Sequence, residues 1–537
     1  MHLNKSKFKG LIVTVLVLMV IIFSPKIILV NKTIRSKYTK IRNKNIKIYL
    51  YENEDKVSNS CLNQDENVKY YTAKYSSIIN VIYNLEKKGY LKKEDRKVLF
   101  KILKEGNVSE LIEKINSLNL NSFDSYSLSK KNLITALTYE LGFFSYDYIE
   151  KFYKKSIEEN KFDIENYVIL AEFYRRNCRY DEAINVLLSI SSIANNSNQK
   201  IDIGKNYRML GDLYLAKRDY ENALANYTNS FVASDIRDDD TRKADILVKI
   251  GDIMSVRGNI FESINYYSYA LSLGKLKNKE KIKLLLKLSD SYYTYGNYEA
   301  GLKFAKEAES KSKKQKHLYY HFKAKYLECL NYEYLSEGEK AAKACKIALE
   351  EAESYREQNN NFESYIALAS MLDFSAYIRN PILAADYAKK AGMSINSEND
   401  IYKKLSAMEA LSSILAYNSS REEKLGVLEI YKVLDNLYKQ NNIGVGCCNS
   451  ILSGFIKEQL GIYGAENDYK KAEFELKNRK IQLATLYIYL SDYYRSKGLV
   501  NEALKYAEMA LRIDSQIYRF DHHYIRYTTG RIDSLKR

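Results

Sequence analysis

The chain has 537 residues, of which 46% are hydrophobic, so it can bury a core, yet it contains only two prolines and no tryptophan. So few prolines over this length favour long, uninterrupted helices. The formal net charge is +17, but the basic residues alternate with acids and accompany no recognition motif, which argues against a nucleic-acid-binding protein. A lysine-rich helix surface, or contact with an anionic surface, remains as the interpretation of the charge.

The amino terminus has a basic start followed by an apolar run from Leu11 to Phe23, which has the length of a signal-peptide core. Counted onward to Val30, the segment has twenty residues, enough to span a bilayer. The small residues of a cleavage site are missing, because Ser-Pro-Lys follows the run. We therefore expect an uncleaved signal anchor over residues 1–30, with a cleaved signal peptide as the alternative.

Lysines lie on both sides of this segment, so its orientation is ambiguous. The larger number follows the segment, and by count the positive-inside rule would place the bulk of the chain in the cytoplasm. A basic stretch directly before an apolar core favours export instead. We expect export, with a cytoplasmic location as the alternative. The basic, polar residues 31–67 are expected to form a linker, and residues 68–128 a cap of two or three short helices.

Five later stretches share one pattern of small residues. The first small position holds Ala171, Gly211, Gly251, Ser289 and Ser491. Twelve residues later stand Ala183, Ala223, Ser263, Gly301 and Ala503, and seven after those stand Ser230, Ala270, Ala308 and Ala510, with the larger Ile190 as the exception in the first stretch. Two helices can cross closely only where small side chains meet, so this pattern predicts repeated helix pairs.

The turn between the two helices of a pair is also marked. Gly258, Gly296 and Gly498 stand where the first helix should stop. The acids that open the second helix, where the helix dipole favours them, are Asp181, Glu221, Glu262, Glu299 and Glu502. Together these features resemble the tetratricopeptide repeat. Successive copies start 38 to 40 residues apart instead of 34, which predicts longer second helices or loops, such as "VASDIRDDDTRK".

The resemblance implies an all-α fold, a right-handed superhelical solenoid of antiparallel helix pairs. We expect the repeat array over residues 129–321, degenerate repeats of the same kind over 322–483, and a last repeat with a capping helix over 484–537. Solenoids of this family are generally non-catalytic and hold peptides or proteins on a concave face lined by the first helix of each pair. The resemblance accordingly implies a protein or peptide partner.

The residue after the first small position should face that concave surface. These residues are all acidic: Glu172, Asp212, Asp252, Asp290 and Asp492. Residues expected on the same helix face include Arg175, Arg208 and Tyr293. Such a stripe would suit a basic peptide or a free amino terminus, and it does not suit the acidic carboxy termini that some family members hold. Alternatively, each acid pairs with Arg175, Arg208 or a lysine of a neighbouring helix.

Other candidate sites are weak. His317 and His321 are four residues apart but have no third metal ligand in register, so we expect surface histidines, as for His522 and His523. Cys329 and Cys345 fall in helical patterns and are expected to be free and apolar in character, because no disulfide or zinc spacing occurs. Cys447 and Cys448 are vicinal, and their role stays open.

No motif predicts catalysis, a metal or a cofactor. Two functions therefore remain. The first is a membrane-anchored scaffold that binds a protein or peptide partner. The alternative is an input module of a bacterial signalling system that acts with an output partner in trans.

Overall fold

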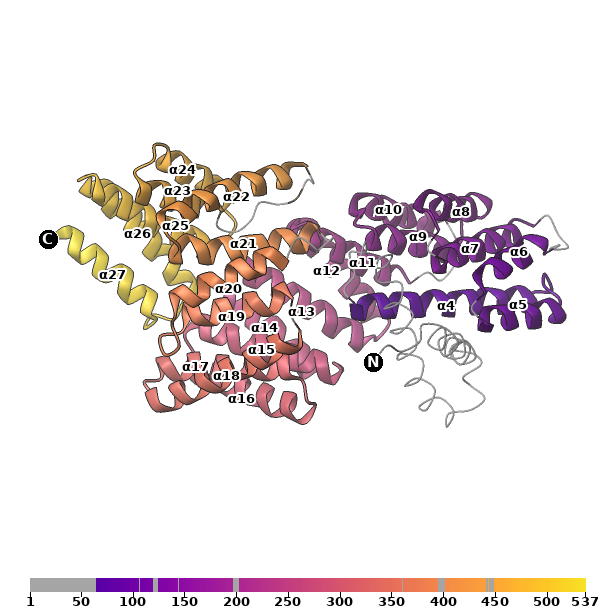
Figure 1. Ribbon diagram of the computed structural model, residues 1–537, viewed down its shortest axis with the longest axis horizontal. Coiled ribbons are helices and arrows are strands. Elements are labelled where there is room, and N and C mark those ends of the chain that lie inside the picture. Colours follow the sequence, from indigo (N-terminus) through magenta and orange to yellow (C-terminus); the bar gives the residue numbers. More distant parts are fainter. Residues whose placement is uncertain are drawn as a thin grey trace, which may run out of the picture. The chain divides into compact units, whose positions relative to one another are not determined.

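A computed structural model of the chain describes residues 64–105, 107–118, 124–142, 144–196, 202–359, 361–394, 401–440, 443 and 449–537. Within these ranges every regular element is an α-helix, in agreement with the expected all-α class (Figure 1). The predicted anchor over residues 1–30, nearly all of the predicted linker and the vicinal cysteines lie outside the described residues. Among the described helices, none is both long and apolar enough to cross a bilayer.

The chain forms two compact units, Met1–Ile201 and Asp202–Arg537. The boundary falls inside the stretch 129–321 that was predicted as one array. The helices of the first unit are α4 (Gln64–Lys87), α5 (Lys93–Glu105), α6 (Val108–Ser117), α7 (Ser125–Leu141), α8 (Tyr146–Glu159), α9 (Ile164–Arg176) and α10 (Tyr180–Asn196).

The second unit contains the longer series of helices. They are α11 (Ile203–Ala216), α12 (Tyr220–Ile236), α13 (Asp240–Val256), α14 (Ile260–Ser272), α15 (Asn278–Tyr295), α16 (Tyr298–Lys314), α17 (Leu318–Tyr334), α18 (Gly338–Gln358), α19 (Phe362–Phe374), α20 (Pro381–Ser394), α21 (Ile401–Asn418), α22 (Arg421–Gln440), α23 (Asn449–Leu460), α24 (Ala465–Glu475), α25 (Lys480–Ser496), α26 (Val500–Ile517) and α27 (His523–Lys536).

Consecutive helices of the second unit pack as pairs, among them α11 with α12, α13 with α14, α15 with α16 and α25 with α26. In the copy that ends with "VASDIRDDDTRK", the extra residues lengthen the helices more than the loop, because α12 runs to Ile236 and α13 begins at Asp240. The turns inside the pairs have the predicted left-handed residue, for example Gly258 with a φ of 79° and Gly296 with a φ of 93°. Glycine adopts this conformation without strain.

The second unit also curls back on itself at three of these turns. Arg218, in the turn between α11 and α12, forms an ion pair with Glu409 of α21 at 2.7 Å. The backbone N–H of Lys480, at the start of α25, donates to the carbonyl of Arg257 at 3.1 Å. The N–H of Arg519, after α26, donates to the carbonyl of Tyr295 at 3.1 Å. The late helices therefore hold the early helix pairs in place.

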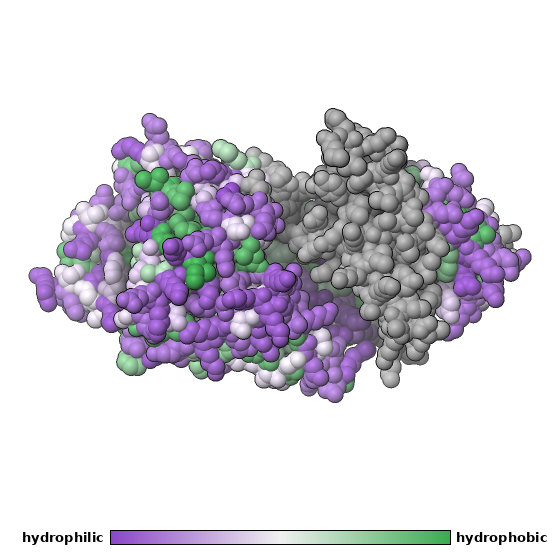
Figure 2. Space-filling view, turned by 60° about the horizontal axis from the view of Figure 1, so that its bottom comes forward, coloured by the Kyte–Doolittle hydropathy of each residue, from purple (hydrophilic) through white to green (hydrophobic). Residues whose placement is uncertain are grey.

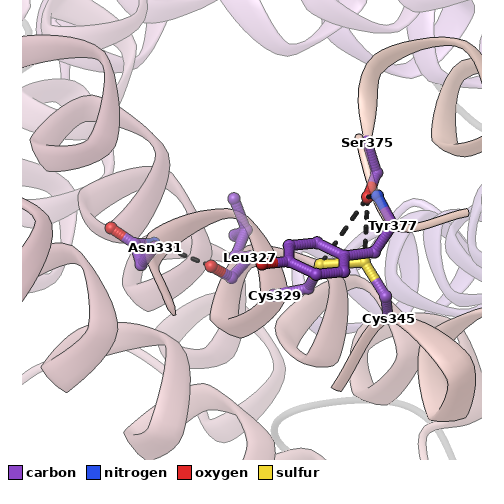
Figure 3. Close-up of a disulfide and its surroundings, with 6 residues drawn as sticks. All are labelled: Leu327, Cys329, Asn331, Cys345, Ser375 and Tyr377. Carbon is purple, nitrogen blue, oxygen red and sulfur yellow. Dashed lines mark hydrogen bonds between the residues drawn. A yellow bond between two sulfur atoms is a disulfide. The ribbon is translucent and has the colours of Figure 1, made fainter. Parts of the chain in front are cut away.

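Cys329 and Cys345 are joined by a disulfide, which corrects the expectation that both are free (Figure 3). The bond links α17 to α18, and both residues are fully buried. The hydroxyl of Ser375 lies 3.0 Å from the sulfur of Cys345 and, because a disulfide sulfur carries no proton, it is the donor. The disulfide could not be predicted from the sequence, because a separation of 16 residues matches no standard spacing. Only the pairing of the two helices brings the cysteines together.

Two histidines expected at the surface are buried. The ring of His321 lies between two acids of α16 and α18, 3.0 Å from Glu309 and 2.5 Å from Glu351. His522 is 3% exposed and stacks on Tyr518 with ring centroids 4.3 Å apart. Burial lowers the pKa of His522 to about 3, so its ring is neutral. On the face shown in Figure 2, most of the coloured residues are hydrophilic, as expected for a lysine-rich chain, with smaller hydrophobic areas.

Candidate partner-binding face

The predicted acids of the second unit lie on the first helices of its early pairs. We call the surface formed by α11, α13, α15 and α17 around Asp212, Asp252 and Asp290 the first-helix face. Its shape depends on how closely each first helix approaches its own second helix. A Cβ on Gly211 would lie 2.6 Å from the ring of Tyr227, and a Cβ on Gly251 would lie 2.5 Å from the ring of Tyr267. Glycine is therefore required at each position of the first helix that is crossed by a tyrosine ring of the second helix.

Asp212 has partners on three helices. Its carboxylate accepts a hydrogen bond from the hydroxyl of Tyr227 on α12 at 2.8 Å. The ammonium of Lys249 on α13 lies 2.9 Å away, and the guanidinium of Arg208 on α11 lies 3.4 Å away. The side chain is only about a third exposed. Asp212 thus connects one helix pair to the next through side chains of the chain itself.

Asp252 repeats this arrangement one pair later. The hydroxyl of Tyr267 on α14 donates to it at 2.5 Å, and the ammonium of Lys287 on α15 lies 2.6 Å away. Burial and the neighbouring carboxylate raise the pKa of Tyr267, as they do for Tyr227, so both phenols remain donors. Each of these two acids, which we call the paired acids, holds a tyrosine of its own pair and a lysine of the following one.

Asp290 on α15 lacks such partners. The position that holds a tyrosine in the two earlier pairs is Ala305 here, and no described residue forms a hydrogen bond or ion pair with Asp290. Its side chain is exposed, yet loss of hydration among the surrounding protein atoms raises its pKa, and Lys287 and Lys323 offset this effect only in part. Among the residues that the structure describes, Asp290 is therefore a carboxylate without a bonded partner.

Lys323 of α17 stands where Lys249 and Lys287 stand in the earlier pairs. Its ammonium lies 4.5 Å from the centroid of the Tyr319 ring instead of bonding to Asp290. Burial lowers the pKa of Lys323, although Glu363 and Asp290 act in the opposite direction. The carboxylate of Asp290 on α15 and the ammonium of Lys323 on α17 therefore attract each other but do not form an ion pair.

The remaining predicted residues lie elsewhere. Asp492 of α25 forms an ion pair with Arg531 of α27. Tyr293 of α15 packs edge-on against Tyr298 and Tyr334, with ring centroids 5.9 and 5.6 Å apart. Glu172 and Arg175 are half-buried on α9 and belong to the first unit. The structure therefore brings Arg208, Asp212, Asp252 and Asp290 onto consecutive first helices.

The lysines Lys249, Lys287 and Lys323 were missed in the sequence. Two of them stand three residues before an acid of the stripe, Lys249 before Asp252 and Lys287 before Asp290. On a helix this spacing places lysine and acid on one face. The regular spacing could have shown that each first helix presents a lysine to the preceding helix and an acid to the following one.

No protein-family model and no curated protein matches the chain. Among solved structures, it is similar to YrrB, described as a TPR protein with an unusual peptide-binding site, with 17% identity and a TM-score of 0.30 over 37% of this chain and 91% of that one. It is also similar to the Rap conjugation gene regulator of the plasmid pLS20 in complex with the Phr* peptide, with 14% identity and a TM-score of 0.38 over 67% and 99% of the two chains.

A third similar structure is a signal transduction ATPase of Pyrococcus horikoshii with a tetratricopeptide repeat sensor, with 13% identity and a TM-score of 0.37 over 86% of this chain and 74% of that one. All three TM-scores are below 0.4. The helix-pair architecture of this chain follows from its own repeated contacts between first and second helices.

Proposed function

We propose that the chain is a non-catalytic scaffold that binds a protein or peptide partner on its first-helix face. One observation carries the proposal: Asp290 is exposed and unbonded among the described residues, whereas Asp212 and Asp252 are engaged. A carboxylate whose hydration is reduced gains much from a cationic partner. A lysine or arginine side chain, or a free amino terminus, would supply that charge. Two of the similar structures are described as peptide-binding, but this proposal depends on Asp290.

The test compares two charge reversals in the full chain. Asp290→Lys places a cation where the partner's cation would bind, and Glu350→Lys makes the same change on the second helix α18, where Glu350 is about two-thirds exposed. Partners are captured by crosslinking in cells and quantified by mass spectrometry. We expect Asp290→Lys to lower recovery of the specific partner at least about tenfold, and Glu350→Lys to leave it unchanged.

The proposal is wrong if folded Asp290→Lys recovers the same partners as the wild type. Helix content and the melting temperature of each variant show whether it is folded. Charge reversal at Asp212 or Asp252 is a poorer test, because those acids hold Tyr227, Tyr267 and two lysines. A loss of partner in such variants could come from loss of the fold.

The location is a second part of the proposal. Residues 1–30 would anchor the chain in the membrane, and the repeats would lie outside the cytoplasm. The apolar segment Leu11–Phe23 supports an anchor, and the buried Cys329–Cys345 disulfide supports an oxidising compartment. Protease added to intact cells should digest the repeats. Their protection would place the repeats in the cytoplasm.

A further inference from the structure

A cavity of about 710 Å³ lies in the second unit among α23, the turn after it, the start of α24 and α25. It is built on different helices from the first-helix face around Asp290. Its volume is in the range that holds a small organic group. Its lining combines aromatic rings with carboxylates, and neither the repeat packing nor the proposed partner binding explains this combination.

Three half-buried rings line the cavity: Phe455 of α23, and Tyr489 and Tyr493 of α25. Phe455 and Tyr489 meet edge-on with centroids 5.3 Å apart. The hydroxyl of Tyr489 lies 2.5 Å from that of Tyr417, which fixes the Tyr489 ring. Tyr493 packs edge-on against the buried ring of Tyr469 at 5.9 Å. The rings are therefore held in place without a ligand.

Three carboxylates line the same cavity, Glu458 of α23, Glu466 of α24 and Asp492 of α25. Glu466 forms an ion pair with Lys470 at 2.7 Å. Glu458 accepts a hydrogen bond from the hydroxyl of Tyr469 at 3.0 Å but forms no ion pair with a described residue. Burial raises the pKa of Glu458, and the charge of Asp492 raises it further, while Tyr469 and Lys497 act in the opposite direction. Asp492 is balanced by Arg531 and remains about half exposed.

The two lysines of the lining do not neutralise Glu458. Lys457 forms an ion pair with Asp468 at 2.7 Å. Lys497 is exposed, and its ammonium lies 5.6 Å from the centroid of the Tyr493 ring. This contact shows that an ammonium group can reach the ring. The cavity therefore offers aromatic faces and an uncompensated carboxylate, two features that attract a cation and disfavour an anion.

We propose that this cavity binds an organic cation, an alkylammonium or guanidinium group, between the rings of Phe455, Tyr489 and Tyr493 and the carboxylates of Glu458 and Asp492. The group can belong to a basic side chain of a peptide or to a free amine. The rings supply cation–π attraction, which is strongest for desolvated cations. Glu458 supplies the charge, and bound cation would lower its pKa, so protons and ligand compete for the site.

The absence of tryptophan from the chain provides a specific assay. Tyr493→Trp introduces a single tryptophan into the cavity and preserves a ring for cation–π contact. The full-length variant is titrated at constant ionic strength with N-acetyl-lysine methylamide, N-acetyl-arginine methylamide and tetramethylammonium, and with N-acetylglutamate as the anion. We expect saturable changes in tryptophan emission with the cations and none with the anion. Calorimetric titration of the wild-type chain repeats the measurement without the reporter.

Two matched variants decide which residue is responsible. Glu458→Gln keeps an acceptor for Tyr469 but removes the charge, and should weaken cation binding about tenfold. Glu473→Gln makes the same change outside the cavity, where Glu473 accepts from Tyr487 at 3.0 Å, and should have no effect. Binding by the capped amino acids alone indicates a peptide side chain, whereas equal binding of tetramethylammonium indicates that charge and cation–π contact suffice and that the cation need not belong to a peptide.

The proposal is overturned if no cation saturates the wild-type protein, if the anion gives the same response, or if Glu458→Gln and Glu473→Gln bind equally. Asp290→Lys should leave the change in tryptophan emission unchanged, because Asp290 does not line the cavity that contains the reporter. An experiment can therefore disprove the cation site without disproving partner binding at the first-helix face, and the reverse.

Discussion

The pairs α13–α14 and α15–α16 use the same sequence position in different ways. Each has an acid after a small residue, Asp252 after Gly251 and Asp290 after Ser289. In the first pair the second helix brings Tyr267 across the glycine, and its hydroxyl bonds the acid at 2.5 Å. In the second pair the corresponding residue is Ala305, and the hydroxyl of Ser289 instead donates to the carbonyl of Gly301 at 2.8 Å.

This difference shows that a repeated residue does not imply a repeated role. Where the small position is glycine, the second helix has a tyrosine at the crossing. The hydroxyl of that tyrosine then forms a hydrogen bond with the acid. Serine there occurs with alanine, and the acid loses that partner. The same residues recur at Ser491, where Ala507 stands at the corresponding position of the second helix and Asp492 pairs with Arg531 instead. Some of the predicted acids therefore bond to neighbouring helices, whereas Asp290 has no bonded partner among the described residues.

The largest effect should come from blocking the glycine–tyrosine crossing. Gly251→Val places side-chain atoms against the ring of Tyr267, because even a Cβ would lie 2.5 Å from it. We expect the free energy of unfolding to fall by about 3 kcal/mol, measured by urea denaturation followed by circular dichroism.

Gly426→Val is the matched control, since a Cβ on Gly426 meets no atom within 4 Å. It should change stability by less than about 0.5 kcal/mol, because glycine and valine differ little in helix propensity. Equal effects of the two substitutions would show that the crossing of α13 and α14 does not require glycine.

The architecture was predictable because small residues recur where helices must cross. Gly211 and Gly251, chosen from spacing alone, are among the residues at which a Cβ would clash with a neighbouring side chain. The left-handed turns at Gly258, Gly296 and Gly498 followed from the same spacing and are confirmed. These signals are local, since one helix and its turn contain them. Local patterns are what a single sequence displays most clearly.

The division of the acids was not predictable in the same way. What separates Asp252 from Asp290 is a residue fifteen positions later on another helix and a lysine of the next pair. His321 and the Cys329–Cys345 disulfide were missed for a similar reason, because their partners lie on adjacent helices at separations with no standard motif. Packing between helices determines these contacts. The sequence shows each residue but does not show which residue of another helix lies against it.

A smaller effect on stability should distinguish Asp252 from Asp290. Asp252→Asn removes the charge that holds Lys287 and weakens the bond to Tyr267, so it should cost about 1 to 2 kcal/mol of unfolding free energy. Asp290→Asn removes no hydrogen bond or ion pair to a described residue and should cost nothing at pH 7. Urea denaturation of both variants decides the matter. A loss of similar size in both would mean that Asp290 also has a structural role.

The smallest effect is the pH dependence of the open acid. Because the pKa of Asp290 is raised in the folded chain, the folded state binds its proton more tightly than the unfolded state does. Its ionisation therefore reduces stability as the pH rises from its unfolded pKa, about 4, through the folded value. The stability difference between Asp290→Asn and the wild type should be near zero below that range and grow in favour of the variant above it.

Urea midpoints of the wild type and Asp290→Asn between pH 3.5 and about 7.5 measure this difference. A difference that instead favours the wild type as the pH rises would show that the carboxylate is already paired in the folded chain. A cationic partner should produce that second pattern, because a positive charge beside Asp290 stabilises its ionised form. Repeating the measurement with a captured partner therefore asks whether the partner's cation lies at Asp290 itself, since binding elsewhere would leave the first pattern unchanged.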